Sequence, residues 1–151
     1  MKKGEKLNIS GPFATEKESL LGSWHASGEV SDVVSFYEGV CAVNGAQNVS
    51  LINDENCDFA EQRDICLVAV GENWQITGEG KTMPNIELPK DQVEAIHKAK
   101  SLGKKVVAVF FAGRPLAFGD VIDECDAVLW AWHGGTMCGL AASEILFGDF
   151  I

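Results

Sequence analysis

The chain has 151 residues, and its 12 basic and 22 acidic side chains give a formal net charge of −10. This length predicts a single domain over residues 1–151, large enough to bury a core without disulfides or metal ions. The acidic balance disfavours binding to nucleic acid or to an anionic membrane, because both present phosphate charge of the same sign. We therefore expect a neutral or cationic partner, or another protein.

Targeting signals and cysteine usage add little more. No apolar run approaches the roughly 20 residues that a membrane-spanning helix needs. The basic residues of 1–6 precede no apolar segment, so no signal peptide is visible. The cysteines are odd in number and lack metal-ligand spacing. This is typical of free thiols in a reducing compartment, which suggests the cytoplasm. These are Cys41, Cys57, Cys66, Cys125 and Cys138. We expect neither a metal nor a cofactor.

Strand-like apolar runs alternate with segments of helical periodicity along the chain. Strands are predicted at 6–10, 48–52, 65–71, 105–112 and 127–132. Helices are predicted from an N-cap at Ser31 or Asp32 to Gly45, from Pro89 to Gly103, and from an N-cap at Thr136 to Gly148.

The last three predicted strands are apolar throughout, which is typical of strands covered on both faces. The predicted fold is α/β, a three-layer sandwich with a mostly parallel sheet flanked by helices. The connection between Ile52 and Ile65 is short for a parallel crossover. Either its helix has about two turns, or the two strands are not parallel neighbours.

Ligands of open α/β sheets gather beyond the carboxyl ends of the strands, so the segment after residues 65–71 is the first place to look. It holds Glu72, Trp74 and the tip Gly78-Glu79-Gly80. Glycines on both sides let the backbone turn sharply and present the glutamate. A carboxylate beside an indole is the chemistry of sugar sites, where the ring stacks on the sugar and the acid supplies a proton. The alternative is that Glu79 is an ordinary solvated acid.

Other candidate residues stand alone. Trp24 is either a ligand platform or a domain-packing residue, and His133 is either a base or a structural histidine. Arg114 follows a strong strand, where we expect it to pair with a buried carboxylate rather than with a substrate. The sequence has no G-x-S-x-G elbow and no convincing Cys/His pair. No complete catalytic set can therefore be assembled from this chain.

Several short motifs, in a fixed order, together carry a family resemblance. They are Leu21-Gly22-Ser23-Trp24, Thr77-Gly78-Glu79, Ile86-Glu87-Leu88-Pro89, Gly113-Arg114-Pro115-Leu116, Asp126–Trp132 and Ile145–Asp149. In this order the chain resembles, nearly end to end, the C-terminal α/β sandwich domain of glycoside hydrolase family 3, the β-glucosidase and β-xylosidase family.

The resemblance implies that this sandwich is of flavodoxin-like type and that the domain has a role in retaining glycoside hydrolysis. In such enzymes an N-terminal (β/α)₈ barrel carries the aspartate nucleophile, and the C-terminal domain of many members lends the acid/base glutamate. Glu79 matches that position, with Thr77 where the family has a serine. The chain departs from the family at Met83, where an arginine is usual, and at Gly134 after His133, where a proline is usual. Glu72 is the next candidate for the acid in this domain.

Two functions remain open at this point. In the first, the chain is the second domain of a β-glycosidase that acts on a carbohydrate, with the barrel absent from this chain. The domain alone is then predicted to be inactive, because one carboxylate cannot perform double displacement. In the second, it is a free-standing, non-catalytic binding or interaction module on the same fold. An apolar patch near Trp24 and Trp74 predicts self-association where no barrel covers it.

Overall fold

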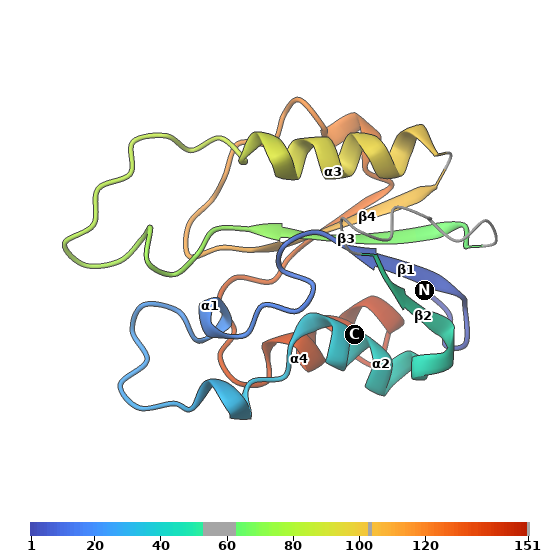
Figure 1. The fold of residues 1–151 in the computed structure, drawn as a ribbon, viewed down its shortest axis with the longest axis horizontal. Helices are drawn as coiled ribbons and strands as arrows, with labels where there is room; N and C mark the ends of the chain where they lie inside the picture. The colour runs from blue at the N-terminus through green and yellow to red at the C-terminus, as the bar shows by residue number, and fades with distance from the viewer. Residues whose placement is uncertain (53–62, 103, 151) are drawn as a thin grey trace.

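The computed structural model describes residues 1–52, 63–102 and 104–150. Its centre is a five-stranded sheet in the order β2-β1-β3-β4-β5, and every neighbouring pair is parallel. The strands are β1 (Leu7–Ser10), β2 (Val49–Leu51), β3 (Ile65–Gly71), β4 (Lys105–Phe111) and β5 (Ala127–Trp130). The strand order is the flavodoxin-like one, so the predicted fold class is confirmed (Figure 1).

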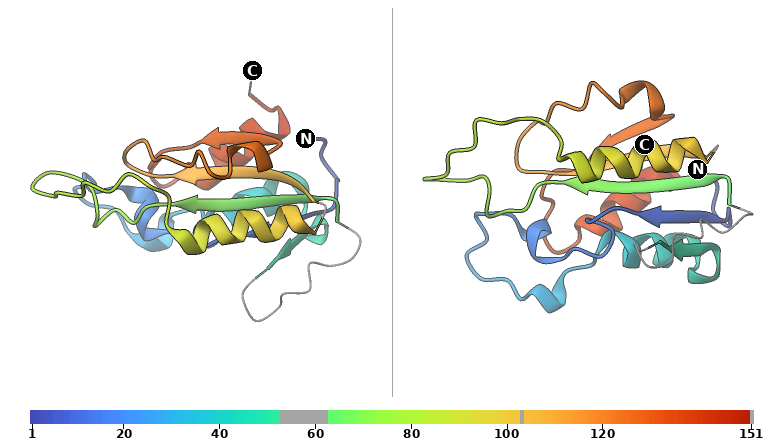
Figure 2. Two further views of the ribbon diagram at one scale, coloured as in Figure 1. Left: turned by 90° about the horizontal axis from the view of Figure 1, so that it is seen from above. Right: turned by 45° about the horizontal axis from the view of Figure 1, so that its top comes forward.

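Helices cover both faces of this sheet. The α-helices are α1 (Glu18–Leu21), α2 (Phe36–Asn44), α3 (Lys90–Ser101) and α4 (Cys138–Phe147). Short 3₁₀ turns lie at η1 (Val30–Asp32), η2 (Ala46–Asn48) and η3 (Ile122–Glu124). Figures 1 and 2 show α2 and α4 side by side on one face and α3 on the other. Within the described residues, no helix is both long enough and apolar enough to cross a membrane.

The core has two halves because successive strand residues point to opposite faces. On the α2/α4 side, Ile9, Leu67 and Phe111 pack against Phe36 and Val40. On the α3 side a separate buried cluster includes Val68, Val70, Ala108, Phe110 and Ile96. β3 and β4 supply both halves, which explains why their sequences show no polar alternation.

The short connection after β2 is explained by the strand order. β1 lies between β2 and β3, so the two strands that this connection joins are parallel but are not neighbours. The predicted short helix of this connection, and Cys57 with it, lie outside the described residues. The other cysteines are free, and burial raises the pKa of the Cys66 thiol to about 11.

Three details of the sequence prediction are wrong. The N-cap of α2 is Ser35, whereas Ser31 and Asp32 lie in η1. The Ser35 hydroxyl accepts a hydrogen bond from the Glu38 N–H, and the Glu38 carboxylate accepts one from the Ser35 N–H. The N-cap of α4 is Met137 rather than Thr136. β5 is not covered on both faces, because it is an outermost strand of the sheet and exposes Val128.

Candidate functional site

The parallel strands all end at the same edge of the sheet, and two long segments extend beyond that edge. These are residues 22–35, which follow α1, and residues 72–88, which connect β3 to α3 (Figures 1 and 2). This edge is where open α/β sheets bind their ligands. The predicted site residues Trp24, Trp74 and Glu79 all lie in these two segments.

The connection from β3 begins at a firmly held point. The buried side chain of Gln92 in α3 donates from Nε2 to the Gly71 carbonyl at 3.0 Å, and its Oε1 accepts from the Gly71 N–H at 2.7 Å. The next residue, Glu72, donates its N–H to the Phe111 carbonyl at 3.0 Å. The loop therefore leaves the sheet from a position that both α3 and β4 fix.

Glu72 forms an ion pair with Arg114 and is only 5% exposed. The guanidinium donates from Nε to Glu72 Oε2 at 2.8 Å and from Nη2 to Oε1 at 2.7 Å, the two-pronged geometry that suits a planar carboxylate. This hydrogen bonding raises the pKa of the Arg114 guanidinium. The predicted pairing of Arg114 with a buried carboxylate is thus confirmed. Because both Glu72 oxygens are occupied, Glu72 is poorly suited to deliver a proton to a substrate.

Glu79 has the opposite environment. Its side chain is exposed, near the middle of the 72–88 loop, and makes no hydrogen bond or ion pair with any residue that the structure describes. Gly78 and Gly80 on either side have φ values of 133° and 71°, which favour glycine. A Cβ on Gly78 would lie 2.7 Å from the Ser23 hydroxyl oxygen, so the tip of the loop touches the segment that carries Trp24.

The two tryptophans differ in exposure. Trp24 is 74% exposed, whereas Trp74 is half-buried and meets the ring of His25 edge-on at a centroid distance of 5.8 Å. The indole N–H of Trp74 is buried and has no acceptor among the described residues. The segments 23–25 and 74–79 therefore lie side by side, and of the two indoles Trp24 is the one that is free to meet a ligand.

His133 lies behind the loop. Its Nε2 donates to the Glu72 carbonyl at 3.2 Å, and its ring lies 3.3 Å from where a Cβ on Gly113 would be. Burial lowers the pKa of His133, which favours the neutral ring. These contacts support the structural interpretation of this histidine. The preceding Trp132 is 49% exposed and has a φ of 59°, a strained value for a residue with a side chain.

Sequence reasoning did not assign Gln92 its role in holding the loop. The signal was present, because Gln92 is a polar residue that shares the inner face of α3 with Ile96 and Ala99. A buried amide on an apolar helix face needs a hydrogen-bond partner, and the backbone at the end of the adjacent strand provides one.

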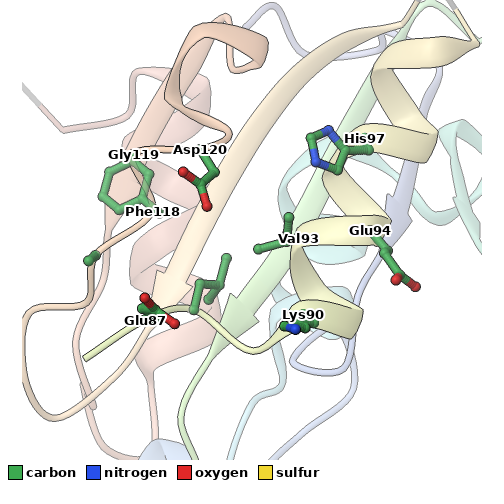
Figure 3. A pocket seen from close by; sticks show the side chains of 10 residues that line it. Glu87, Lys90, Val93, Glu94, His97, Phe118, Gly119 and Asp120 are labelled. Carbon is green, nitrogen blue, oxygen red and sulfur yellow. The ribbon is translucent and has the colours of Figure 1, made fainter. Parts of the chain in front are cut away.

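A cavity of about 590 Å³ lies between α3 and residues 117–120 (Figure 3). Its lining combines apolar side chains, among them Val93 and Phe118, with polar ones, among them Lys90, His97 and Asp120. The Nδ1 atom of His97 lies 2.5 Å from Oε1 of Glu124. None of Glu79, Trp74 and Trp24 lines this cavity. Over the described ranges, no group of three or more His, Cys, Asp or Glu side chains could hold a metal ion.

We next compared the sequence of the chain with known protein families. Residues 1–150 match the model of the glycosyl hydrolase family 3 C-terminal domain. The chain belongs to this family. The family 3 domain is 28% identical to a periplasmic beta-glucosidase of Salmonella typhimurium over 99% of its own length, and 28% identical to a beta-xylosidase of Formosa agariphila over 96%. It spans only 24% and 22% of the length of those two relatives.

Solved structures agree with the sequence comparison. The crystal structure of a beta-glucosidase from Listeria innocua in complex with isofagomine superposes on the family 3 domain with a TM-score of 0.90 and 28% identity. The match covers 99% of this chain and 22% of the Listeria chain. In these relatives the family 3 domain is thus one part of a considerably longer protein.

Proposed function

We propose that this family 3 domain supplies Glu79 as the general acid/base of a retaining β-glycosidase whose nucleophile comes from a (β/α)₈ barrel outside this chain. One observation carries the proposal. Glu79 is an exposed carboxylate without a partner in the described structure. It lies between two glycines near the middle of the 72–88 loop, and the first residue of that loop, Glu72, is tightly held. An acid that serves a neighbouring domain needs this combination of reach and a fixed origin.

Each chemical step assigns Glu79 one proton transfer. In the first step the barrel aspartate attacks the anomeric carbon while Glu79 protonates the departing glycosidic oxygen. In the second step Glu79, now a carboxylate, takes a proton from the water that cleaves the glycosyl–enzyme bond. The exposed indole of Trp24, beside the loop, offers a surface on which the sugar ring stacks.

In this proposal the nucleophile lies outside this chain, so we expect the chain alone not to hydrolyse aryl β-glucosides or β-xylosides above background. The first measurement is therefore a hydrolysis assay of the purified chain. Activity that survives purification and is lost in Glu79→Gln would show that a second carboxylate within this chain completes the reaction, against the proposal.

The decisive experiment uses a protein in which this domain follows a family 3 barrel. Glu79→Ala is expected to lower the hydrolysis of disaccharides by about 10²–10⁴-fold, because their leaving groups need protonation. The glycosylation step of dinitrophenyl glycosides should lose much less, since that phenolate departs unprotonated. Azide should restore turnover of these activated substrates, because as a nucleophile it needs no general base.

Glu94→Ala is the matched control, because Glu94 is an exposed glutamate on α3 and Figure 3 shows its carboxylate directed away from the cavity. This variant should hydrolyse both substrate classes at the wild-type rate. Unchanged disaccharide hydrolysis in Glu79→Ala would overturn the proposal. The domain would then be a non-catalytic module, since Arg114 already occupies Glu72, the other candidate acid.

A further inference from the structure

The last residue of β4 and the segment that follows it hold both ends of the 72–88 loop. At the start of the loop, the Glu72 N–H donates to the carbonyl of Phe111, the last residue of β4. At its end, Ala117 donates its N–H to the Ile86 carbonyl at 2.6 Å and accepts from the Leu88 N–H at 2.9 Å, as in a parallel bridge. Residues 111–117 therefore form a clamp across the base of the loop.

Arg114 lies at the centre of this clamp and contacts three separate positions of the loop. Besides its two hydrogen bonds to the Glu72 carboxylate, it donates from Nη1 to the Met83 carbonyl at 2.6 Å and from Nη2 to the Asn85 carbonyl. One guanidinium thus joins the first residue of the loop to residues near its end.

We propose that Arg114 is a positioning residue that fixes the reach of Glu79 by tying Glu72 to the carbonyls of Met83 and Asn85. This inference rests on the proposed function of Glu79. With both ends tied, the freely extending part of the loop is confined to residues 73–82. A shorter loop has fewer conformations, so Glu79 occupies its working position for a larger fraction of the time.

The chemistry of the clamp requires arginine. A guanidinium has five N–H groups in a rigid plane, enough to bind a carboxylate with one edge and carbonyls with its remaining hydrogens. A lysine ammonium keeps the positive charge and one contact with Glu72, but it cannot span the carboxylate and both carbonyls. Arg114→Lys therefore removes the tie to residues 83 and 85 while it leaves the buried charge of Glu72 compensated.

A second arginine provides a matched control. Arg63 donates from Nη1 to the carbonyls of Leu7 and Asn48, each at 2.8 Å, beside the starts of β1 and β2. It is also a guanidinium bound to backbone carbonyls, but it lies at the opposite edge of the sheet from Glu79. Arg63→Lys should lower thermal stability without affecting the loop.

The first measurement is amide hydrogen exchange in the chain itself. In Arg114→Lys, the amides of Gln75, Ile76 and Lys81, which are hydrogen-bonded within the loop, should exchange faster, while the amides of β3 and β4 keep their protection. In Arg63→Lys the 75–82 segment should exchange as in the wild type. Should Arg114→Lys fail to fold, Glu72→Gln is the second variant, because it frees one side of the clamp and keeps the size of the side chain. Wild-type protection of 75–82 in a folded Arg114→Lys or Glu72→Gln protein would overturn the inference.

The second measurement separates positioning from stability in the barrel-containing protein. Arg114→Lys should lower kcat on disaccharides by roughly 10–10²-fold with little change in KM, because misplacing an acid impairs the chemical step more than binding. Dinitrophenyl glycosides should lose much less in the glycosylation step. A merely structural residue would reduce the amount of active protein equally for both substrates.

Glu79→Ala, run alongside, keeps the two proposals distinguishable. If Glu79→Ala retains disaccharide hydrolysis, the proposed function fails, whatever Arg114→Lys does. If Glu79→Ala loses that activity but Arg114→Lys hydrolyses both substrates as the wild type does, the role of Arg114 is wrong and the role of Glu79 stands.

Discussion

An arginine binds backbone carbonyls at the edge of the sheet where the parallel strands begin, and another does so at the edge where they end, but the two arginines have different roles. At the edge where the strands begin, Arg63 joins the carbonyls beside two neighbouring strands and so reinforces the sheet. At the edge where the strands end, Arg114 joins a buried carboxylate to a loop that extends away from the sheet. The same chemistry thus stabilises the scaffold at one edge and shapes a candidate site at the other.

Two glycines on either side of β1 also differ between the two edges. Gly4, before β1, and Gly11, after β1, have similar φ values of 86° and 90°. A Cβ on Gly4 would meet nothing within 4 Å, whereas one on Gly11 would lie 2.2 Å from the carbonyl oxygen of Ala69 in β3. Gly11 is therefore packed closely against β3, whereas Gly4 has open space around it.

The largest effect is expected from substituting these two glycines. Gly4→Ala should cost about 1–2 kcal/mol of unfolding free energy, the strain of a left-handed conformation alone. Gly11→Ala adds a backbone clash to this strain, so we expect a loss of about 2–5 kcal/mol. Urea unfolding of both variants measures the difference. Equal losses would show that Gly11→Ala causes no clash with Ala69.

A smaller effect is expected from neutralising the buried ion pair. Glu72→Gln leaves the Arg114 guanidinium without its counter-charge in a largely buried place, which should cost about 1–3 kcal/mol. The exposed pair of Lys100 and Asp126, 3.0 Å apart, is the comparison, and Lys100→Met should barely change the unfolding midpoint. A Lys100→Met loss as large as that of Glu72→Gln would contradict the assignment of Glu72 as a structural anchor.

The fold was largely predictable because the strands of this sheet are short, apolar runs separated by glycines and helical patterns. Ile65–Gly71 and Lys105–Phe111 could be recognised almost to the residue, since both are buried on two faces. Periodicity could not give the strand order, because it says nothing about which strands pair; only the family resemblance implied a flavodoxin-like sheet. For the same reason the exposure of Val128 was missed: an edge strand and a central strand can have the same composition.

The site was predictable only in outline. The position of Glu79 after a strand and between glycines indicated a presented carboxylate, and Arg114 was expected to find a buried acid. That its partner is Glu72, and that the same guanidinium also reaches the carbonyls of Met83 and Asn85, depends on backbone contacts far apart in the sequence. Side-chain patterns carry no information on such carbonyls, so the clamp could be found only in the structure.

A further prediction concerns the surface at the site edge. Trp24 is 74% exposed, and without a covering domain it offers an apolar contact to a second copy of the chain. We expect weak self-association, and Trp24→Ser should lower the association constant by roughly tenfold, or about 1.4 kcal/mol. Sedimentation equilibrium over a range of concentrations measures this. A strictly monomeric wild-type chain at high concentration would contradict the prediction.

The smallest expected effect is the pH dependence that His133 contributes. Burial lowers the pKa of this ring below its ordinary value of 6.5, so the folded state favours neutral histidine while the unfolded state takes up a proton first. Its contribution to stability is therefore complete above pH 6.5 and is lost as the pH falls through that value toward the folded-state pKa. Glu38 and Asp126 have pKa values lowered from 4.5 and 3.8, so their contributions are lost only in more acidic solution.

The test compares wild type with His133→Gln, which removes the titrating ring and keeps an amide N–H to donate to the Glu72 carbonyl. Between about pH 7.5 and about pH 5.5, the wild type should lose more stability than His133→Gln, by less than the limit of about 1.4 kcal/mol per pH unit for one proton. Thermal unfolding at both pH values measures this difference. A wild type that gains stability relative to His133→Gln on acidification would mean that the ring is held as its cation. Attraction to the Glu72 carboxylate would then outweigh burial at the edge of the sheet that carries the site.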